Sequence, residues 1–425
     1  MTFRPLYNYQ REGIKKGKEN LKKRGFTYLG WEPGLGKSRA ILQIGFESRL
    51  LDNVLIVAPA FLTYNWKNEV SKWMDSPCSI LTQPDDLLFR EAISVCSYDF
   101  VRTHIKDITD SMGKISLLIL DEAHYVNNKG ALRTQAIWGK LAHKARKIAC
   151  LSGTPTVNGP WEMYPVFAIT GFISSSYAAW MDWFITDELG KPINIAGDYF
   201  HKFKNIYKTV VHTYKKQDVL KDLPPIQFVP HYVKSLIKIP PDFEIPENID
   251  EIPEIPEELQ SLYRDLGERK VPEVLELIAA WSSECIRPHR LVIFAYNHSV
   301  IDALHSRIGK YYPPDAKIHK ITGQVSHENR NMIVQEFQSE TNYHQVIVGQ
   351  MHAMGVGINL TSCNDVIFVQ HPWTPATYNQ CVSRCHRIGT KKGLKVIDII
   401  AQNTLDSSVI GTIQRKAQLI GMYDN

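Results

Sequence analysis

Six short apolar runs, rich in β-branched residues, are the feature that most constrains the fold of this chain. Each run holds four or five residues, and segments of helical pattern separate them. Continuous apolar strands of this kind are typical of parallel sheets that helices cover on both faces. We therefore predict an α/β fold with parallel sheets flanked by helices. The runs are Val54–Ala58, Ser116–Leu120, Lys147–Leu151, Leu291–Phe294, Gln345–Val348 and Asp365–Val369.

A segment rich in proline and glutamate separates the first three runs from the last three. Between Ile239 and Glu257 repeated prolines forbid a helix and disfavour a central strand, while acidic residues keep the segment solvated. The strand pattern therefore occurs twice, which indicates two similar lobes. We predict a first lobe over residues 1–224, a linker over 225–256 and a second lobe over 257–425.

A glycine-rich segment follows the likely strand Phe26–Leu29 and precedes a helical pattern. Glycines let backbone N–H groups close around phosphate oxygens, and the helix N-terminus adds positive potential. We expect Lys37 to reach the β- and γ-phosphates and Ser38 to bind Mg²⁺. The strict P-loop pattern fails at its first position, which is Trp31. The residues assigned to phosphate binding are Pro33, Gly34, Leu35, Gly36, Lys37 and Ser38.

A second motif supports the P-loop interpretation. The run that ends at Leu120 delivers Asp121 to the carboxyl end of a strand, with Glu122 directly after it. We expect Asp121 to be the second Mg²⁺ ligand and Glu122 to orient or deprotonate the attacking water. The two motifs agree in order and spacing, and together they predict ATP and Mg²⁺ as cofactors.

Composition supports a globular protein of ordinary surface charge. The formal charge is +5, and the chain is 44% hydrophobic, with no apolar run near the ~20 residues of a membrane span. A basic cluster from Lys15 to Arg24 either binds an anionic partner or is the solvated face of a helix. The N-terminus lacks a signal-peptide pattern, and seven cysteines contain no C-x-x-C pair. We expect an intracellular protein, cytoplasmic or nucleoid-associated, with reduced cysteines.

In their order along the chain, these motifs resemble superfamily 2 helicase-type motors, and more narrowly the Swi/Snf-type DNA-dependent ATPases. The resemblance implies two tandem RecA-like lobes, with ATP held between them. It assigns Tyr9 and Gln10 to adenine recognition and Gly357 to the nucleotide. It assigns coupling of hydrolysis to lobe movement to His124, Ser152 and Thr154.

The strongest element of the resemblance is Gln380-Cys-Val-Ser-Arg-Cys-His-Arg-Ile-Gly389. Placed on a helix, Gln380, Arg384 and Arg387 have spacings of i, i+4 and i+7, so they share one face. The resemblance implies that Arg384 and Arg387 act as arginine fingers on ATP bound by the other lobe.

Other motif positions imply contacts with a DNA strand. The residues so assigned are Pro59, Ser97, Thr322, Gly323, Thr361 and Trp373. Val369–Pro375 resembles a Trp-Asn-Pro element and favours the distal branch, which includes annealing helicases, although Thr374 replaces the usual Asn. Thr213–Val219 lacks the paired arginines that the family commonly has there.

We therefore predict a DNA-stimulated ATPase that translocates along double-stranded DNA or forked and junction DNA. It would act as a monomer, with any targeting protein unidentified. One alternative is a strand-separating superfamily 2 helicase. Another is a nucleotide-gated DNA-binding protein without turnover.

Overall fold

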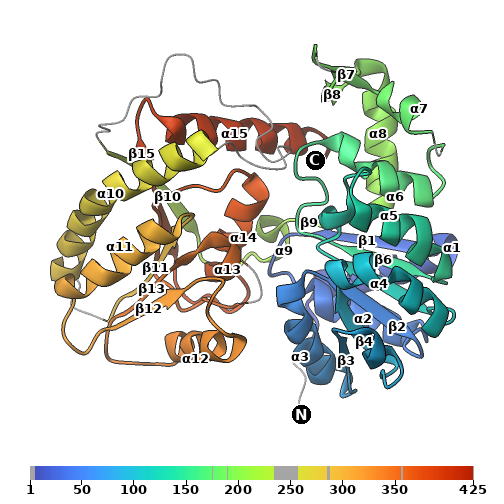
Figure 1. Ribbon diagram of the computed structural model, residues 1–425, viewed down its shortest axis with the longest axis horizontal. Coiled ribbons are helices and arrows are strands. Elements are labelled where there is room, and N and C mark those ends of the chain that lie inside the picture. Colours follow the sequence, from blue (N-terminus) through green and yellow to red (C-terminus); the bar gives the residue numbers. More distant parts are fainter. Residues whose placement is uncertain are drawn as a thin grey trace. The chain divides into compact units, whose positions relative to one another are not determined.

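The computed structural model describes residues 5–174, 176–188, 190–233, 257–284, 288–355 and 358–424. These form two compact units, each with its own sheet (Figure 1). The first unit runs up to Val219 and includes the chain end from Gln418, and the second is Leu220–Ala417.

A seven-stranded sheet, in the order β3-β4-β2-β5-β6-β1-β9, forms the centre of the first unit among the described residues. Every pairing in it is parallel. Its strands are β1 (Phe26–Trp31), β2 (Val54–Ala58), β3 (Ser79–Leu81), β4 (Ile93–Ser97), β5 (Leu117–Asp121), β6 (Ile148–Leu151) and β9 (Val211–Tyr214). Its helices are α1 (Asn8–Arg24), α2 (Lys37–Glu47), α3 (Thr63–Met74), α4 (Tyr98–Ser111), α5 (Leu132–Ala136), α6 (Tyr164–Ile169), α7 (Tyr177–Met181), α8 (Gly197–Val210) and α9 (Lys216–Val219).

The second unit has a six-stranded sheet, in the order β10-β15-β14-β11-β13-β12 within the part of the chain that the structure describes. All of its pairings are parallel as well. Its strands are β10 (Ile226–Val233), β11 (Arg290–Ala295), β12 (Lys317–Ile321), β13 (Gln345–Gln350), β14 (Asp365–Phe368) and β15 (Leu394–Ala401). Its helices are α10 (Glu257–Glu284), α11 (His298–Ile308), α12 (His327–Gln338), α13 (Met351–Met354), α14 (Pro375–Cys385) and α15 (Leu405–Asp424), of which the part from Gln418 on is grouped with the first unit.

Burial explains why the apolar runs form central strands. Every residue of β1, β2, β5 and β6 is buried, so both faces of these strands are covered. Such coverage is what helices on both sides of a parallel sheet provide. The predicted α/β fold with two lobes is confirmed, and all six apolar runs lie in strands.

The predicted linker needs a correction at its start. Residues 226–233 form β10, which pairs with β15 over its whole length. Pro230 is tolerated there because β10 is an edge strand, where a missing N–H removes no ladder bond. The two units divide after Val219, and residues 234–256 of the predicted linker lie outside the described residues.

A small antiparallel hairpin, which the sequence pattern did not predict, belongs to the first unit. It consists of β7 (Phe184–Thr186) and β8 (Pro192–Ile195). Trp180 of α7 is 1% exposed and contacts the ring of Phe184. Phe203 of α8 packs on the same tryptophan. An aromatic cluster thus attaches the hairpin and α7 to α8.

Two further features agree with the composition. Within the described ranges, no helix is long and apolar enough to cross a membrane. The six cysteines described there are free thiols, and those residues include no cluster of side chains suited to a metal ion. Cys285 lies outside the described residues.

A buried ion pair connects α10 to the start of α15 in the second unit. Lys270 Nζ lies 2.8 Å from Asp406 Oδ2, and the two side chains are 2% and 0% exposed. Lys270 also donates to the carbonyl of Ile399, and Asp406 accepts from the backbone N–H of Ala401. Burial lowers the pKa of Lys270, so the carboxylate partner is needed to keep the ammonium charged.

Removing only the cation should destabilise this unit strongly. Lys270→Met leaves a buried carboxylate unpaired, and we expect a loss of about 3–5 kcal/mol in the free energy of unfolding. In the double variant, Asp406→Asn also removes the unpaired negative charge and keeps an oxygen that accepts from the N–H of Ala401. We expect it to recover about half of the lost free energy of unfolding. Urea unfolding of the three proteins measures this. A single-variant loss under about 1 kcal/mol would show that the pair is not important for stability.

Candidate functional site

Three loops lie side by side at the carboxyl edge of the first sheet. Strand β6 pairs with β1 on one side and with β5 on the other. Leu151 at the end of β6 is in register with Leu29 and with Asp121. The loops after β5 and β6 therefore begin at one level of the sheet edge, and β1 continues for two more residues, to Trp31, before its loop begins. This edge is where parallel α/β sheets bind ligands.

The first loop has the backbone geometry of a phosphate-binding turn. Gly34 and Gly36 have φ values of 89° and 82°, in the left-handed region that favours glycine. Gly36 is also the residue before α2, so Lys37 and Ser38 stand at the positive end of that helix. A Cβ on Gly36 would lie 2.5 Å from Gln10 Nε2. Glycine at position 36 is therefore favoured both by its positive φ and by the closeness of the Gln10 side chain.

Trp31 explains the departure from the strict P-loop pattern. It is the last residue of β1 and is fully buried, so this position belongs to the strand and needs no glycine. Its carbonyl accepts a 2.7 Å hydrogen bond from Lys37 Nζ. The lysine thus bends back over the loop that it follows.

Two residues of α1 hold the same loop from the other side. The hydroxyl of Tyr9 and the amide of Gln10 both donate to the carbonyl of Leu35, at 2.9 and 3.0 Å. Burial raises the pKa of Tyr9, so its hydroxyl remains protonated and can donate. Pro33 lies close to the next loop, since a Cβ on Gly153 would come 2.7 Å from its ring. The predicted nucleotide residues of this unit are therefore packed together.

The Asp-Glu pair after β5 is buried. Asp121 and Glu122 are 9% and 8% exposed. Asp121 Oδ2 accepts a 2.7 Å hydrogen bond from the indole of Trp66, and the carbonyl of Asp121 accepts from the hydroxyl of Tyr98. Burial and the neighbouring Glu122 raise the pKa of Asp121, while Lys37 opposes this shift. Two carboxylates and one lysine thus share a site with little water.

Glu122 has an unusual backbone conformation. Its φ of 48° and ψ of 54° place it in the left-handed region, which costs a non-glycine residue about 1–3 kcal/mol. Its Oε2 is buried without a hydrogen-bond partner. Strain and an unsatisfied carboxylate on one residue are typical of a functional position.

His124 connects this pair to the loop after β6. Its Nδ1 lies 3.0 Å from Ser152 Oγ and 3.4 Å from Glu122 Oε2. The Ser152 hydroxyl donates to the carbonyl of Thr154 and accepts from its N–H. Nδ1 must therefore carry the hydrogen toward Ser152. Burial lowers the pKa of His124 to about 4, so the ring is neutral near pH 7 and makes no ion pair with Glu122.

In the second unit, α14 carries Gln380 and Arg384 but not Arg387. The helix ends at Cys385, and His386 is extended, with φ −122° and ψ 95°. The prediction that the three residues share one helix face is therefore wrong for Arg387. His386 Nε2 bonds the carbonyl of Pro224 instead of continuing the helix.

The loop after α14 is nevertheless fixed. Thr390 Oγ1 donates to the carbonyl of Arg387 at 2.8 Å and accepts from its N–H at 3.1 Å. Arg384 Nε donates to the carbonyl of Gly355 at 2.7 Å. This bond joins α14 to the end of α13, two segments that the resemblance had linked to the nucleotide. Gly357, also assigned to the nucleotide, lies outside the described residues.

The residues predicted to contact DNA differ in their accessibility. Pro59, Thr322 and Trp373 are buried, and the Trp373 ring packs 4.8 Å from that of Tyr263. A DNA contact through these three side chains is not supported by their burial. Some exposed surface remains on the other three residues predicted to contact DNA, which are Ser97, Gly323 and Thr361.

Two of the motif positions act as helix N-caps. Ser97 caps α4 by accepting from the N–H of Phe100, and Thr374 caps α14 by accepting from the N–H of Thr377. Threonine and asparagine both serve as helix N-caps, so Thr374 can cap α14 as the usual asparagine would.

Aromatic residues that the motifs did not identify surround the start of the P-loop. The Trp31 indole donates to His212 Nδ1 at 3.3 Å, and the Tyr214 ring lies 5.3 Å from Trp31 and 5.5 Å from Tyr9. Glu32 accepts from the backbone N–H of Lys216, where α9 begins. The segment without the paired arginines is therefore attached directly to the P-loop.

The fold and this site define a P-loop protein of the helicase type, built from two α/β units. The chain belongs to the SNF2-related family: residues 9–235 match the SNF2-related domain, and residues 269–389 match the helicase conserved C-terminal domain.

Similar proteins include a human protein named "DNA annealing helicase and endonuclease ZRANB3", 24% identical over 98% of this chain and 40% of that protein. An "Uncharacterized ATP-dependent helicase" of Mycoplasma pneumoniae is 27% identical over 98% of this chain and 42% of its own length. The chain thus spans about two fifths of these relatives. The solved "Sulfolobus solfataricus SWI2/SNF2 ATPase core in complex with dsDNA" shares 18% identity at a TM-score of 0.45, covering 99% and 95% of the two chains.

The His212 contact predicts a pH-dependent stability. Burial and Lys16 lower the pKa of His212 to about 4, against about 6.5 in an unfolded chain. Between these values the unfolded chain binds more protons. Stability is therefore complete above about pH 6.5 and falls as the pH is lowered toward 4.

His212→Gln keeps an acceptor for the Trp31 indole but does not titrate. We expect it to remove up to about 2 kcal/mol of the stability that the natural protein loses between about pH 7 and pH 5. Urea unfolding at both pH values measures this, with the exposed His143 changed to Gln as a control. An unchanged pH dependence in His212→Gln would show that folding does not lower the pKa of His212.

Proposed function

We propose that this protein hydrolyses ATP and uses the energy to move along double-stranded DNA. The observation that carries the proposal is the shared edge of β5, β6 and β1, which brings Lys37, Asp121, Glu122 and Ser152 together. Phosphate-binding backbone, a lysine and two buried carboxylates form the set that phosphoryl transfer to water requires. Membership of the SNF2-related family supports the same conclusion.

The residues present fit a nucleotide with a divalent cation. Two adjacent carboxylates at 9% and 8% exposure repel each other, and a cation between phosphate and carboxylate relieves that repulsion. Ser38 and Asp121 are the residues that would hold Mg²⁺. When bound, the ion neutralises phosphate charge.

The side chains of the first unit then have separate roles. Lys37 neutralises charge on the phosphates, Glu122 takes the proton of the attacking water, and Asp121 is held by Trp66 and Tyr98. The His124 and Ser152 contact links the carboxylate loop to the next loop, so a change at the phosphates can reach Thr154. This linkage is the route by which hydrolysis would drive movement.

The second unit would complete the reaction. Arg384 and Arg387 carry the charge that an arginine finger needs, and Arg387 lies in a loop fixed by Thr390. An arginine on a loop can be aimed at a phosphate independently of the helix axis. We therefore retain both arginines as proposed catalytic residues and Gln380 as a proposed nucleotide contact.

Double-stranded DNA is the proposed track, and forked or junction DNA the proposed biological form. The name of the human relative includes DNA annealing, which is the pairing of two strands into a duplex, and this supports a duplex as the track. A motor that follows the phosphate backbone reads no bases. Ser97, Gly323 and Thr361 retain exposed surface for such contacts.

An ATPase assay with four DNA conditions tests the function. Turnover is measured without DNA, with single strands, with duplex and with a forked junction. We expect strong stimulation by duplex and fork and weak stimulation by single strands. Single strands as the best activator would indicate a strand-separating helicase, and no turnover under any condition would indicate a passive binder.

Glu122→Gln should separate binding from hydrolysis. The amide keeps the shape of the side chain but cannot take a proton, so we expect ATP binding to persist while kcat falls by about 10²–10⁴. Lys37→Ala is the companion variant and should lose most ATP turnover. Measuring ATP affinity beside kcat separates the two effects. Near-normal kcat in Glu122→Gln would exclude Glu122 as the base.

Arg387→Ala tests the contribution of the second unit. We expect kcat to fall by about 10³ with a much smaller change in ATP affinity, because a finger acts on transition-state charge. Lys391→Ala, which removes a nearby exposed cation, is the control and should be close to normal. Weak ATP binding with normal turnover at saturation would make Arg387 a ground-state ligand instead.

A further inference from the structure

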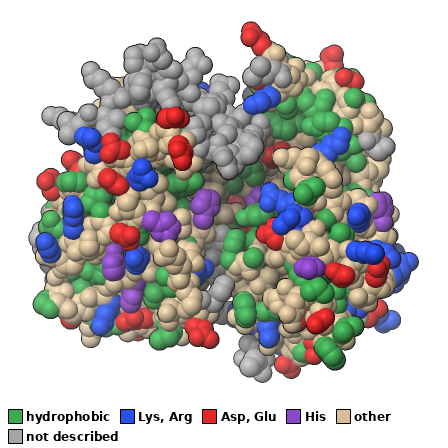
Figure 2. Space-filling model, viewed as in Figure 1, with side chains coloured by type: hydrophobic (Ala, Val, Ile, Leu, Met, Phe, Trp, Pro, Cys, Tyr) green, Lys and Arg blue, Asp and Glu red, His purple; other side chains and the backbone are tan. Residues whose placement is uncertain are grey.

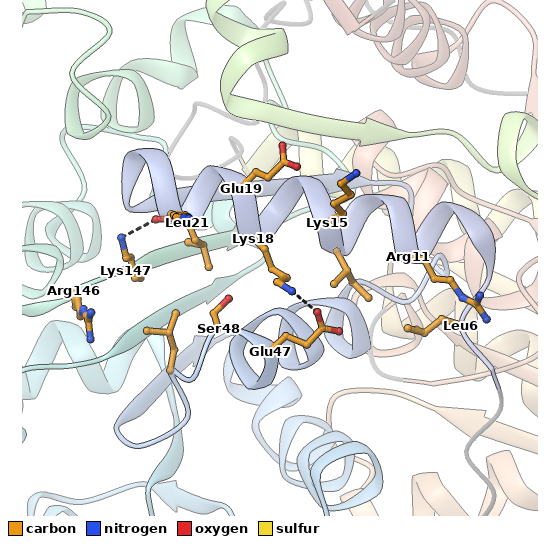
Figure 3. Close-up of a pocket in the computed structure, with 13 residues that line it drawn as sticks. Leu6, Arg11, Lys15, Lys18, Glu19, Leu21, Glu47, Ser48, Arg146 and Lys147 are labelled. Carbon is orange, nitrogen blue, oxygen red and sulfur yellow. Dashed lines mark hydrogen bonds and ion pairs between the residues drawn. The ribbon is translucent and has the colours of Figure 1, made fainter.

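A groove lies on the first unit, between α1 and the end of α2 (Figure 3). Its volume is about 700 Å³. One wall is α1, and the other is formed by Glu47 and Ser48 at the end of α2. Arg146 and Lys147, just before β6, close one end (Figure 3). None of these residues belongs to the proposed ATP site.

The α1 wall carries a stripe of cations. Arg11, Lys15, Lys18 and Lys22 have spacings of i, i+4, i+7 and i+11, so they follow one another along the helix. Of these four cations, only Lys18 forms an ion pair with a described residue. Its Nζ lies 2.6 Å from Glu47 Oε2. Arg11, Lys15 and Lys22 are exposed. The basic cluster seen in the sequence is thus partly gathered into one concave surface.

The groove has an excess of positive charge and an apolar floor. Six basic side chains line it, against the carboxylates of Glu19 and Glu47. Lys147 Nζ donates a hydrogen bond to the carbonyl of Leu21 and so caps the end of α1 (Figure 3). The apolar lining residues are Leu6, which is half-buried, and Ile14, Leu21 and Leu50, which are at most 4% exposed, so most of the accessible apolar surface of these four belongs to Leu6. On the face of the molecule in Figure 2, by contrast, basic and acidic side chains are mixed.

We infer that this groove binds an acidic peptide segment of a partner protein, with carboxylates for the cations and apolar side chains for the floor. Charge complementarity selects acidic residues, and the leucine and isoleucine floor selects apolar side chains between them. The stripe from Arg11 to Lys22 is about 16 Å long, which about five residues of extended peptide span. A phosphate backbone fits less well, because it offers nothing to the floor and meets Glu19 and Glu47.

Docking here would act on α1, the helix that carries Tyr9 and Gln10. Arg11 directly follows these residues, which hold the P-loop through Leu35. The groove is nevertheless separate from the residues proposed for hydrolysis. Peptide binding can therefore be tested apart from ATP turnover.

The test measures the fluorescence anisotropy of a labelled synthetic peptide that alternates glutamate with isoleucine. Lys15→Glu with Lys22→Glu reverses two groove charges. Lys16→Glu with Lys23→Glu makes the same charge change one residue further along α1, outside the groove. We expect the groove variant to bind at least about tenfold more weakly than the natural protein, and the control variant within about twofold. Circular dichroism and basal ATPase should be unchanged in both.

Three results would overturn the inference. Equal weakening in both variants would show that only net charge matters. Equal binding of a peptide of glutamate alone would show that the floor contributes nothing. Displacement of the peptide by duplex DNA, with a loss of DNA affinity confined to the groove variant, would assign the groove to nucleic acid.

Discussion

The parallel pairing of β6 with both β1 and β5 is the constraint on which the candidate site depends. Leu151 is in register with Leu29 and with Asp121, so the loops after β5 and β6 leave the sheet at one level, next to the loop that follows β1 two residues further on. A slip of one residue in β5 would turn Asp121 to the opposite face of the sheet. The fully buried strands prevent such a slip, because each apolar side chain must face a covering helix. Packing of the core therefore positions the carboxylates.

The same core makes unfavourable local features tolerable. Glu122 combines a left-handed backbone with an unsatisfied buried oxygen, and Asp121 is buried beside it. Hydrogen bonds from Trp66 and Tyr98 fix Asp121 and its carbonyl without neutralising the charge. A site held in this way needs little rearrangement to receive the phosphates and the divalent cation that we propose it binds. In the second unit the buried Lys270 and Asp406 form an ion pair, so the net charge there is already neutralised.

Sequence patterns predicted the central strands and the P-loop well, because both depend on local rules. Continuous apolar runs can satisfy their burial only inside a covered sheet, and Gly34 and Gly36 are needed wherever φ is positive. The end of α14 was not predictable from spacing, since His386 leaves the helical conformation there and its ring bonds the distant Pro224. β10 was mistaken for linker because its proline is acceptable only at a sheet edge. The contact of Trp66 with Asp121 was not predictable either, since the two residues are far apart in the sequence and only the fold brings the indole to the carboxylate.

We propose that ATP hydrolysis in this protein drives movement along intact duplex DNA. Displacement of a third strand from a DNA triplex measures that movement without requiring the duplex to open. We expect ATP-dependent displacement of the third strand, absent with a non-hydrolysable nucleotide, and no unwinding of a tailed duplex under the same conditions. Efficient unwinding of the tailed duplex, with no displacement of the third strand, would contradict it.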